Sequence, residues 1–302
     1  MTNNQDKHDN IIAPFTLNNH SFKGKIVKLS DALNNAVYKH SYPYHISKLL
    51  CELLIAASMI GDNLKHGILT IQIKSNDIIN LLVADYFDGG KIRGYANWNI
   101  DAYEKIKDGS PSFQDLISNG YMAITLDQGP GTDLYQGIVE IKGNDLSECL
   151  NEYFIQSEQI ETCFKIMVGE EIKSDGFKKW CGGGIMVQKL PDVENTNFTD
   201  LDAWEKVKIF VDTVKSDELI DPLIEPNTLL HRLFHEEEVW IYEPKFVEHK
   251  CRCSRERANN IVSTIPESEL NELAIDGKVE VKCEFCGKEE IFKVEEIVKD
   301  AL

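Results

Sequence analysis

Four cysteines near the C-terminus constrain this chain more than any other feature. Cys251 and Cys253 form a Cys-x-Cys pair, Cys283 and Cys286 form a Cys-x-x-Cys pair, and 29 residues lie between the two pairs. Two close pairs at such a separation are typical of a tetrahedral site in which four thiolates bind one zinc ion. Gly287 follows the second pair, as in zinc knuckles whose sulfurs accept hydrogen bonds from turn amides. The spacing therefore predicts that these cysteines bind one Zn²⁺.

A zinc ion held by four thiolates has no open coordination position. Catalytic zinc keeps one position for water, so this pattern indicates a structural site and argues against hydrolysis. Structural zinc binding is worth on the order of 10–16 kcal/mol and is coupled to folding. Thiolates are also oxidisable. We therefore expect a small domain that zinc keeps folded and that an oxidant unfolds by converting the ligands into disulfides.

Length and charge narrow the class of protein. The chain has 302 residues, enough for roughly two or three domains. Its net charge of −18 disfavours nucleic acid and anionic membranes as partners. The first ten residues lack the apolar stretch of a secretory signal, and the longest apolar run, Leu49–Ile60, is too short to span a bilayer. We expect a cytoplasmic protein, in a compartment that keeps thiols reduced.

Residues 1–190 are predicted to form one mixed domain. The predicted helices are Leu49–Lys65, which Gly67 should end, and Leu146–Ser157. Asp88, Gly89 and Gly90 have the chemistry of a hairpin turn. Helices and strands do not alternate regularly, so the fold class is predicted to be α+β, with a mixed α/β core domain. The predicted strands are Ile68–Ile73, Ile78–Ala84, Lys91–Ala96, Met122–Leu126, Gly137–Ile141, Phe164–Val168 and Gly184–Gln188.

Residues 191–247 are predicted to form an acidic helical linker. They contain fourteen acidic and five basic residues, a net charge of −9. Apolar residues at helical spacing from Leu201 to Val214 predict one helix, and Pro226–Phe234 predicts another. Helices this short owe most of their stability to packing, so the linker should depend on its neighbours. The residues expected to dock it are Trp204, Val207, Val211, Leu230, Leu233 and Phe234.

Residues 248–302 are predicted to form the zinc-binding domain. Ser254–Ile261 and Pro266–Ala274 should be helices, Val279–Val281 and Glu290–Phe292 should be strands, and a C-terminal helix should follow. So short a domain with so small a core normally needs a cross-link, which the metal would provide.

Other patterns give no catalytic site. His231 and His235 are spaced like metal ligands, but position 239 is Val, so the metalloprotease motif is absent. Gly182–Gly184 enters a predicted strand and not a helix, which excludes the dinucleotide-binding pattern. The scattered cysteines 51, 149, 163 and 181 are interpreted as small buried apolar residues. We predict that the protein is not an enzyme.

Longer stretches resemble a known family. The sequence CRCSRER at 251–257 followed by CEFCG at 283–287 resembles the redox switch of the heat-shock protein 33 family, which are bacterial redox-regulated holdase chaperones. Residues 135–139, 153–159 and 183–188 resemble its core domain, and residues 229–236 resemble its linker. The resemblance covers nearly the whole chain.

The resemblance implies a chaperone that needs no ATP and is inactive while reduced and zinc-bound. Oxidation would form Cys251–Cys253 and Cys283–Cys286 disulfides, expel zinc, unfold the switch and loosen the linker. Apolar surface would then hold unfolding client proteins, and the monomer would become a homodimer. Two other interpretations are a thiol–disulfide oxidoreductase that uses Cys283 and Cys286, and a zinc-knuckle module that binds a fixed partner.

Overall fold

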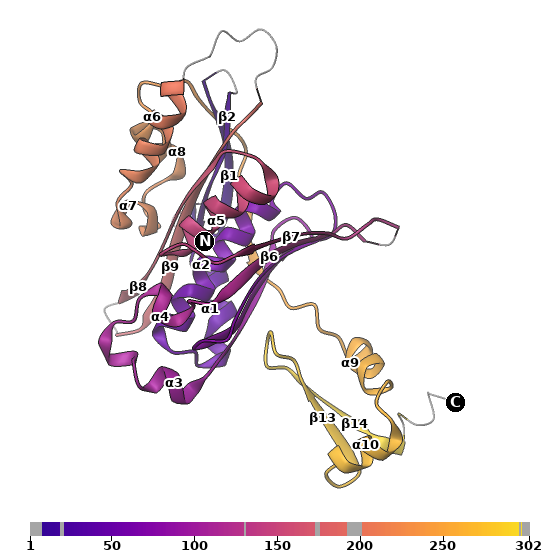
Figure 1. The fold of residues 1–302 in the computed structure, drawn as a ribbon. Coiled ribbons are helices and arrows are strands. Elements are labelled where there is room, and N and C mark those ends of the chain that lie inside the picture. Colours follow the sequence, from indigo (N-terminus) through magenta and orange to yellow (C-terminus); the bar gives the residue numbers. More distant parts are fainter. Residues whose placement is uncertain are drawn as a thin grey trace, which may run out of the picture. The chain divides into compact units, whose positions relative to one another are not determined.

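The chain divides into two units, Met1–His249 and Lys250–Leu302. The computed structural model describes residues 8–18, 21–129, 131–172, 176–191, 201–295 and 297. Helices and strands are mixed along the chain, so the fold is α+β, as the sequence predicts (Figure 1).

The first unit contains two six-stranded sheets. The first sheet has the order β10-β1-β2-β9-β8, and β11 also pairs with β1. Its strands are β1 (Ile11–Leu17), β2 (Phe22–Leu29), β8 (Thr162–Ile172), β9 (Lys178–Lys189), β10 (Val239–Ile241) and β11 (Lys245–Phe246). The second sheet has the order β12-β5-β4-β3-β6-β7. Its strands are β3 (Ile68–Ser75), β4 (Ile79–Phe87), β5 (Lys91–Trp98), β6 (Gly120–Asp127), β7 (Tyr135–Glu140) and β12 (Glu248–His249).

Helix α2 (Tyr44–Gly61) packs against strands of both sheets (Figure 1). By length and composition it could cross a membrane, but 72% of it is buried inside the unit, as in the core helix of many folded domains. It extends beyond the apolar run Leu49–Ile60 at both ends. The remaining short helices of the core are α1 (Asp31–Val37), α3 (Ile100–Glu104), α4 (Phe113–Leu116), α5 (Leu146–Tyr153), the 3-10 turns η2 (Tyr38–His40) and η3 (Lys107–Gly109), and the π-helical turn η4 (Phe154–Glu158).

The first sheet is buried on both faces, and its side chains alternate between two apolar clusters. On β9, Met186 joins the cluster around α2, whereas Ile185 and Val187 join a second cluster on the opposite face. Successive side chains of a strand point to opposite faces, which explains the alternation. Helices α6 (Leu201–Asp212), α7 (Ser216–Ile220) and α8 (Pro226–Leu233) cover this second face (Figure 1).

Several predicted boundaries are wrong. Helix α2 ends at Gly61 and not at Lys65, and Gly67, with φ +99°, lies beyond the turn that follows the helix. At this end, Lys25 of β2 donates to the Met59 carbonyl and Lys245 of β11 donates to the carbonyl of the cap residue Asp62, so these carbonyls have partners outside the helix. The predicted helix Leu146–Ser157 is α-helical only to Tyr153 and continues as η4. No local pattern led us to predict β1 or β2.

The linker prediction was incomplete. Helices form at both predicted places, but residues 239–246 are extended and pair with β1 as β10 and β11. The register joins Thr16 to Trp240 and Ile12 to Lys245, across more than 220 residues of sequence. A pairing at that separation leaves no local periodicity in the sequence, which is why a helical linker alone was expected.

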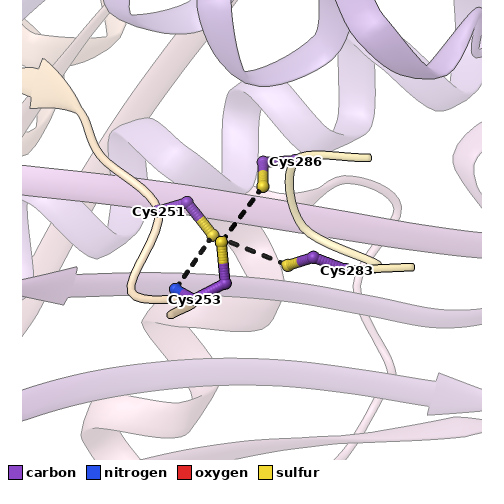
Figure 2. A group of neighbouring side chains, drawn as sticks. All are labelled: Cys251, Cys253, Cys283 and Cys286. Atoms are coloured by element: carbon purple, nitrogen blue, oxygen red, sulfur yellow. Dashed lines mark hydrogen bonds between the residues drawn. The ribbon is translucent and has the colours of Figure 1, made fainter. Parts of the chain in front are cut away.

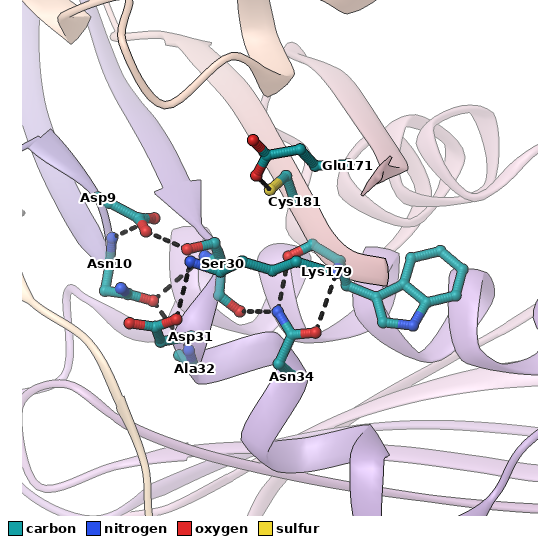
Figure 3. A network of polar contacts seen from close by, with 10 residues as sticks. Asp9, Asn10, Ser30, Asp31, Ala32, Asn34, Glu171, Lys179 and Cys181 are labelled. Atoms are coloured by element: carbon teal, nitrogen blue, oxygen red, sulfur yellow. Dashed lines mark hydrogen bonds and ion pairs between the residues drawn. The ribbon is translucent and has the colours of Figure 1, made fainter. Parts of the chain in front are cut away.

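A network of polar contacts joins β1, α1 and β9 (Figure 3). The Asn10 side chain accepts hydrogen bonds from the backbone amides of Ser30 and Ala32, at 3.2 and 2.9 Å. The Asn34 side chain donates to the carbonyl of Trp180 and accepts from its amide, at 2.8 and 2.9 Å. The Asn10 contacts satisfy amides at the start of α1, where helical amides lack internal partners, and the Asn34 contacts join α1 to β9.

The described part of the second unit contains a hairpin and two short named helices. Its elements are α9 (Arg255–Val262), α10 (Glu267–Leu273), β13 (Lys278–Lys282) and β14 (Glu289–Lys293). The predicted C-terminal helix falls largely on residues outside those described. Among the described residues of this unit, the buried apolar cluster is small and consists of Val262, Leu270, Val279, Phe292, Val294 and Ile297.

Candidate metal centre

Two separate segments of the second unit bring the cysteines together. Cys251 and Cys253 lie in the segment that precedes α9. Ser254 caps the N-terminus of α9, because its side chain accepts a hydrogen bond from the Arg257 amide at 3.1 Å. Cys283 and Cys286 lie in the turn that joins β13 to β14. The cap fixes where the helix begins, and the hairpin fixes where the turn lies, so both pairs are positioned by secondary structure.

The four sulfur atoms converge on one point (Figure 2). All lie within 4.8 Å of one another. The Sγ–Sγ distances are 3.6 Å between Cys251 and Cys283, and 3.4 Å between Cys253 and Cys286. Zinc–sulfur bonds of about 2.3 Å in a tetrahedron place sulfurs about 3.8 Å apart. The donor set and its spacing therefore fit one metal ion held by four thiolates.

Backbone geometry shapes the second pair. The Cys286 and Gly287 amides donate to the Cys283 carbonyl at 3.3 and 2.8 Å, and the Cys283 amide donates to the Lys288 carbonyl at 2.9 Å. Gly287 has φ +67°, in the left-handed region that residues with a Cβ atom rarely adopt. The glycine after the second pair is thus needed to close the turn around the metal site.

Electrostatics distinguish the cysteines. Burial alone would raise the pKa of the Cys251 thiol. Hydrogen bonds to its sulfur outweigh burial and lower the pKa to about 7. The largest of these contributions comes from the Cys253 amide, which donates to the Cys251 sulfur at 3.4 Å. Burial raises the pKa of Cys253 and of Cys283, and thiol neighbours raise both further. At least one thiol of the cluster is therefore readily ionised near neutral pH.

Three basic residues around the site are paired with acids. Arg255 binds Glu290 at 3.0 Å and lies over the Phe292 ring at 4.7 Å. Lys288 binds the same Glu290 at 2.7 Å, and Lys282 binds Glu289 at 3.4 Å. The Arg255–Glu290 pair joins the start of α9 to β14, whereas the two lysine pairs lie within the hairpin that holds the cysteine turn.

The other four cysteines are buried in the first unit and far from ionising. Burial raises the pKa of Cys149 and Cys181 to about 11 and that of Cys163 to about 12, and it raises the pKa of Cys51 as well. Since the thiolate is the reactive form, these thiols are poor nucleophiles. Their placement agrees with their interpretation as small apolar residues.

The predicted docking residues all lie in the second apolar cluster, between the first sheet and α6–α8. Trp204 stacks on Phe22 with ring centroids 5.8 Å apart, and Phe234 lies 6.1 Å from Phe15. The cluster includes Trp204, Val207, Val211, Leu230, Leu233 and Phe234. A continuous apolar interface therefore joins the linker helices to the sheet.

Two residues of the first sheet, Lys28 and Gly183, contact α7 in ways that the sequence did not predict. The buried ammonium of Lys28 donates to the carbonyls of Glu218 and Asp221 at the end of α7, at 3.2 and 2.6 Å. Burial lowers its pKa to about 8. A Cβ atom on Gly183 would lie 2.4 Å from the Leu219 carbonyl oxygen, so this glycine lets α7 approach the sheet. Neither role has a signal in the local sequence.

The sequence matches the family described as "Hsp33 protein" over residues 10–293. The chain belongs to the Hsp33 family. Among Hsp33 relatives, the 33 kDa chaperonin of Caulobacter vibrioides is 33% identical over 291 residues, which cover 95% of each chain. The 33 kDa chaperonin of Shigella flexneri is 33% identical over 287 residues, which cover 94% of this chain and 93% of the relative.

A solved Hsp33 structure has the same fold. The 33 kDa chaperonin of Thermotoga maritima, a heat shock protein 33 homolog, superposes with a TM-score of 0.80. The match covers 96% of this chain and 98% of that chain, at 25% sequence identity. The resemblance expected from the cysteine motif therefore holds for both the sequence and the fold.

Proposed function

We propose that this protein is a redox-regulated, ATP-independent chaperone that holds unfolding proteins under oxidative stress. One observation carries the proposal: the chain combines a four-thiol site with an apolar interface between the first sheet and the linker helices α6–α8. The linker precedes the four-thiol site in the sequence. The 33 kDa chaperonin relatives support the chaperone class. We place the protein in the cytoplasm, with unfolded proteins as partners and neither nucleic acid nor membrane.

Cys251, Cys253, Cys283 and Cys286 would hold one Zn²⁺ in the reduced state. When bound, zinc supplies a cross-link between the segment before α9 and the β13–β14 turn. On oxidation, two thiols form one S–S bond and lose two protons, while their two electrons reduce a peroxide to water. A sulfur in a disulfide is no longer a thiolate ligand, so the cross-link is lost.

The disulfides proposed from the family resemblance are Cys251–Cys253 and Cys283–Cys286. In the structure the short sulfur contacts are Cys251 with Cys283 and Cys253 with Cys286, so each joins one cysteine of the first pair to one of the second. All four sulfurs nevertheless lie within 4.8 Å of one another. A Cys-x-Cys disulfide closes a very small ring and should be strained, hence easily reduced. Easy reduction suits a reversible sensor.

The linker would act as the gate. Its helices cover an apolar sheet face that includes Phe15, Phe22, Ile26, Ile185 and Val187. Loss of the cross-link would unfold the second unit and release the linker, a shift in population between two states. The uncovered apolar residues would then bind clients and favour a homodimer over the reduced monomer.

An aggregation assay tests this function against its alternatives. We expect the peroxide-treated protein to suppress aggregation of a thermally unfolding client without ATP, and the reduced protein to do so weakly or not at all. Catalytic turnover of small disulfides that depends on Cys283 and Cys286 alone would indicate an oxidoreductase. Partner binding that is present in the reduced protein and lost on oxidation would indicate a zinc-knuckle module.

Elemental analysis tests the metal. We expect one equivalent of zinc per reduced chain, and less than a tenth of it in Cys283→Ser, because a site with three thiolates binds zinc far more weakly. Cys181→Ser is the matched control, since Cys181 lies in the first unit. Full zinc content in Cys283→Ser would disprove the assignment of the four ligands.

A further inference from the structure

The last five residues of the first unit, Lys245–His249, form a strap that pairs with both sheets. Lys245 and Phe246 pair with β1, and Glu248 and His249 pair in parallel with β5. Between them, the Val247 amide donates to the Asn10 carbonyl at 2.7 Å, and the Val247 side chain is buried in the cluster around α2. The strap therefore joins the two sheets directly through backbone hydrogen bonds, whereas helix α2 joins them through side-chain packing.

The β4–β5 turn is shaped to receive the strap. Gly90 has φ +142°, and a Cβ atom there would lie 2.2 Å from the Phe246 carbonyl oxygen. The Glu248 amide donates to the Gly90 carbonyl at 2.9 Å. A side chain at position 90 would separate the turn from the strap, so this glycine serves a close backbone approach.

One side chain of the strap reaches a buried carboxylate of the core. The Lys245 ammonium lies 2.8 Å from Asp62 Oδ1 and 3.3 Å from the Asp62 carbonyl oxygen. The Asp62 side chain is only 3% exposed, whereas that of Lys245 is 50% exposed. Asp62 is the C-terminal cap of α2, where the helix dipole favours a cation.

A second lysine, Lys25, also pairs with Asp62 and would remain its partner if the strap separated from the core. The buried Lys25 ammonium lies 3.5 Å from Asp62 Oδ2 and donates to the Met59 carbonyl at 2.7 Å. A buried carboxylate that loses every cation is strongly destabilising. Lys25 belongs to β2 and does not move with the linker, so the contact with Lys245 can break without leaving a buried charge unpaired.

We propose that the Lys245–Asp62 ion pair is a latch that holds the strap, and with it the linker, in the closed state. Cys251 follows the strap by two residues, so the strap is the segment through which a change at the cysteines reaches the core. This inference rests on the proposed function for its biological meaning, but the latch itself is a property of the reduced protein.

Hydrogen exchange of the reduced, zinc-loaded protein tests the latch. Lys245→Met keeps most of the side-chain stem and removes the charge. We expect the amides of Tyr242, Val247 and Glu248 to exchange about tenfold faster, because a hydrogen bond to a charged group is lost. Lys245→Arg should restore most of the protection. Exchange at the Cys283 amide and the zinc content should not change, which separates the latch from the metal site.

Lys165→Met is the matched control, because Lys165 also joins the core to the linker through an ion pair, at 3.6 Å from the exposed Asp212. It should leave the strap amides unaffected. Equal exchange in Lys245→Met and Lys165→Met would overturn the latch. A double variant, Lys245→Met/Asp62→Asn, gives a second test. We expect Lys245→Met to cause no further increase in strap exchange once Asp62 is replaced. If the effects of the two single substitutions instead add in the double variant, the latch is also overturned.

The aggregation assay separates the latch from the function. If the oxidised parent protein suppresses aggregation, Lys245→Met should reach half-activation at a lower peroxide dose. If the oxidised parent does not suppress aggregation, the proposed function fails, while the exchange difference between Lys245→Met and Lys165→Met still decides the latch.

Discussion

Phe234→Asp is expected to activate the reduced, zinc-bound protein without any oxidant. The Phe234 side chain is fully buried between Phe15 and Phe210, with both pairs of ring centroids 6.1 Å apart. An unpaired carboxylate in this place costs several kcal/mol, enough to undock helices that are stable only through packing. The chaperone assay of fully reduced protein should then show activity close to that of the oxidised parent.

Trp204→Ala tests the same gate without introducing a charge. Removing this stacked indole costs about 3–5 kcal/mol and should also give activity in the reduced state. Ile209→Asp is the control, because Ile209 belongs to the same helix, α6, but its side chain is 59% exposed. If hydrogen exchange shows α6–α8 undocked while the reduced variants remain inactive, the linker is not the gate.

Local patterns predicted the parts of the fold that are stabilised locally. The apolar spacing of Trp204, Val207 and Val211 predicts α6, and the Asp88–Gly90 turn predicts the β4–β5 hairpin. Strands β10–β12 were missed because they are short and their partners lie far away in the sequence. Strands β1 and β2 form a hairpin and were also missed, and Pro14 inside β1 argues locally against a strand. The α+β class was predictable because it needs only the order of the elements.

In the candidate site and the linker interface, too, a local sequence pattern predicts some residues and gives no signal for others. Four cysteines in two tight pairs were sufficient to predict the cluster, since thiolate spacing reflects metal geometry directly. The buried lysines Lys25 and Lys28 were not predictable, because each binds backbone carbonyls or a carboxylate from a distant element. They are three residues apart and point to opposite faces of β2, so no pattern in the sequence marks either of them as buried. Asp62 likewise has no sequence signal for the two cations that it binds.

Removing zinc from the reduced protein is expected to unfold residues 250–302 and to leave the core of the first unit folded. The described residues of the second unit bury few apolar side chains, and structural zinc supplies on the order of 10–16 kcal/mol. Its loss exceeds the stability of about 3–8 kcal/mol that a unit of this length would have at roughly 0.05–0.15 kcal/mol per residue. Treatment with a chelator and a thiol reductant should therefore abolish protection of the Cys283 and Leu270 amides.

The first unit provides the internal control. The amides of β3 and β4 lie in the second sheet and should keep their protection, whereas those of α6–α8 and the strap should lose part of it. Adding zinc back should restore protection in residues 250–302, because no disulfide has formed. If the chelated, zinc-free protein keeps its β13–β14 amides protected, the apolar core alone folds this unit. In that case oxidation must act through the disulfides themselves and not through loss of the metal cross-link.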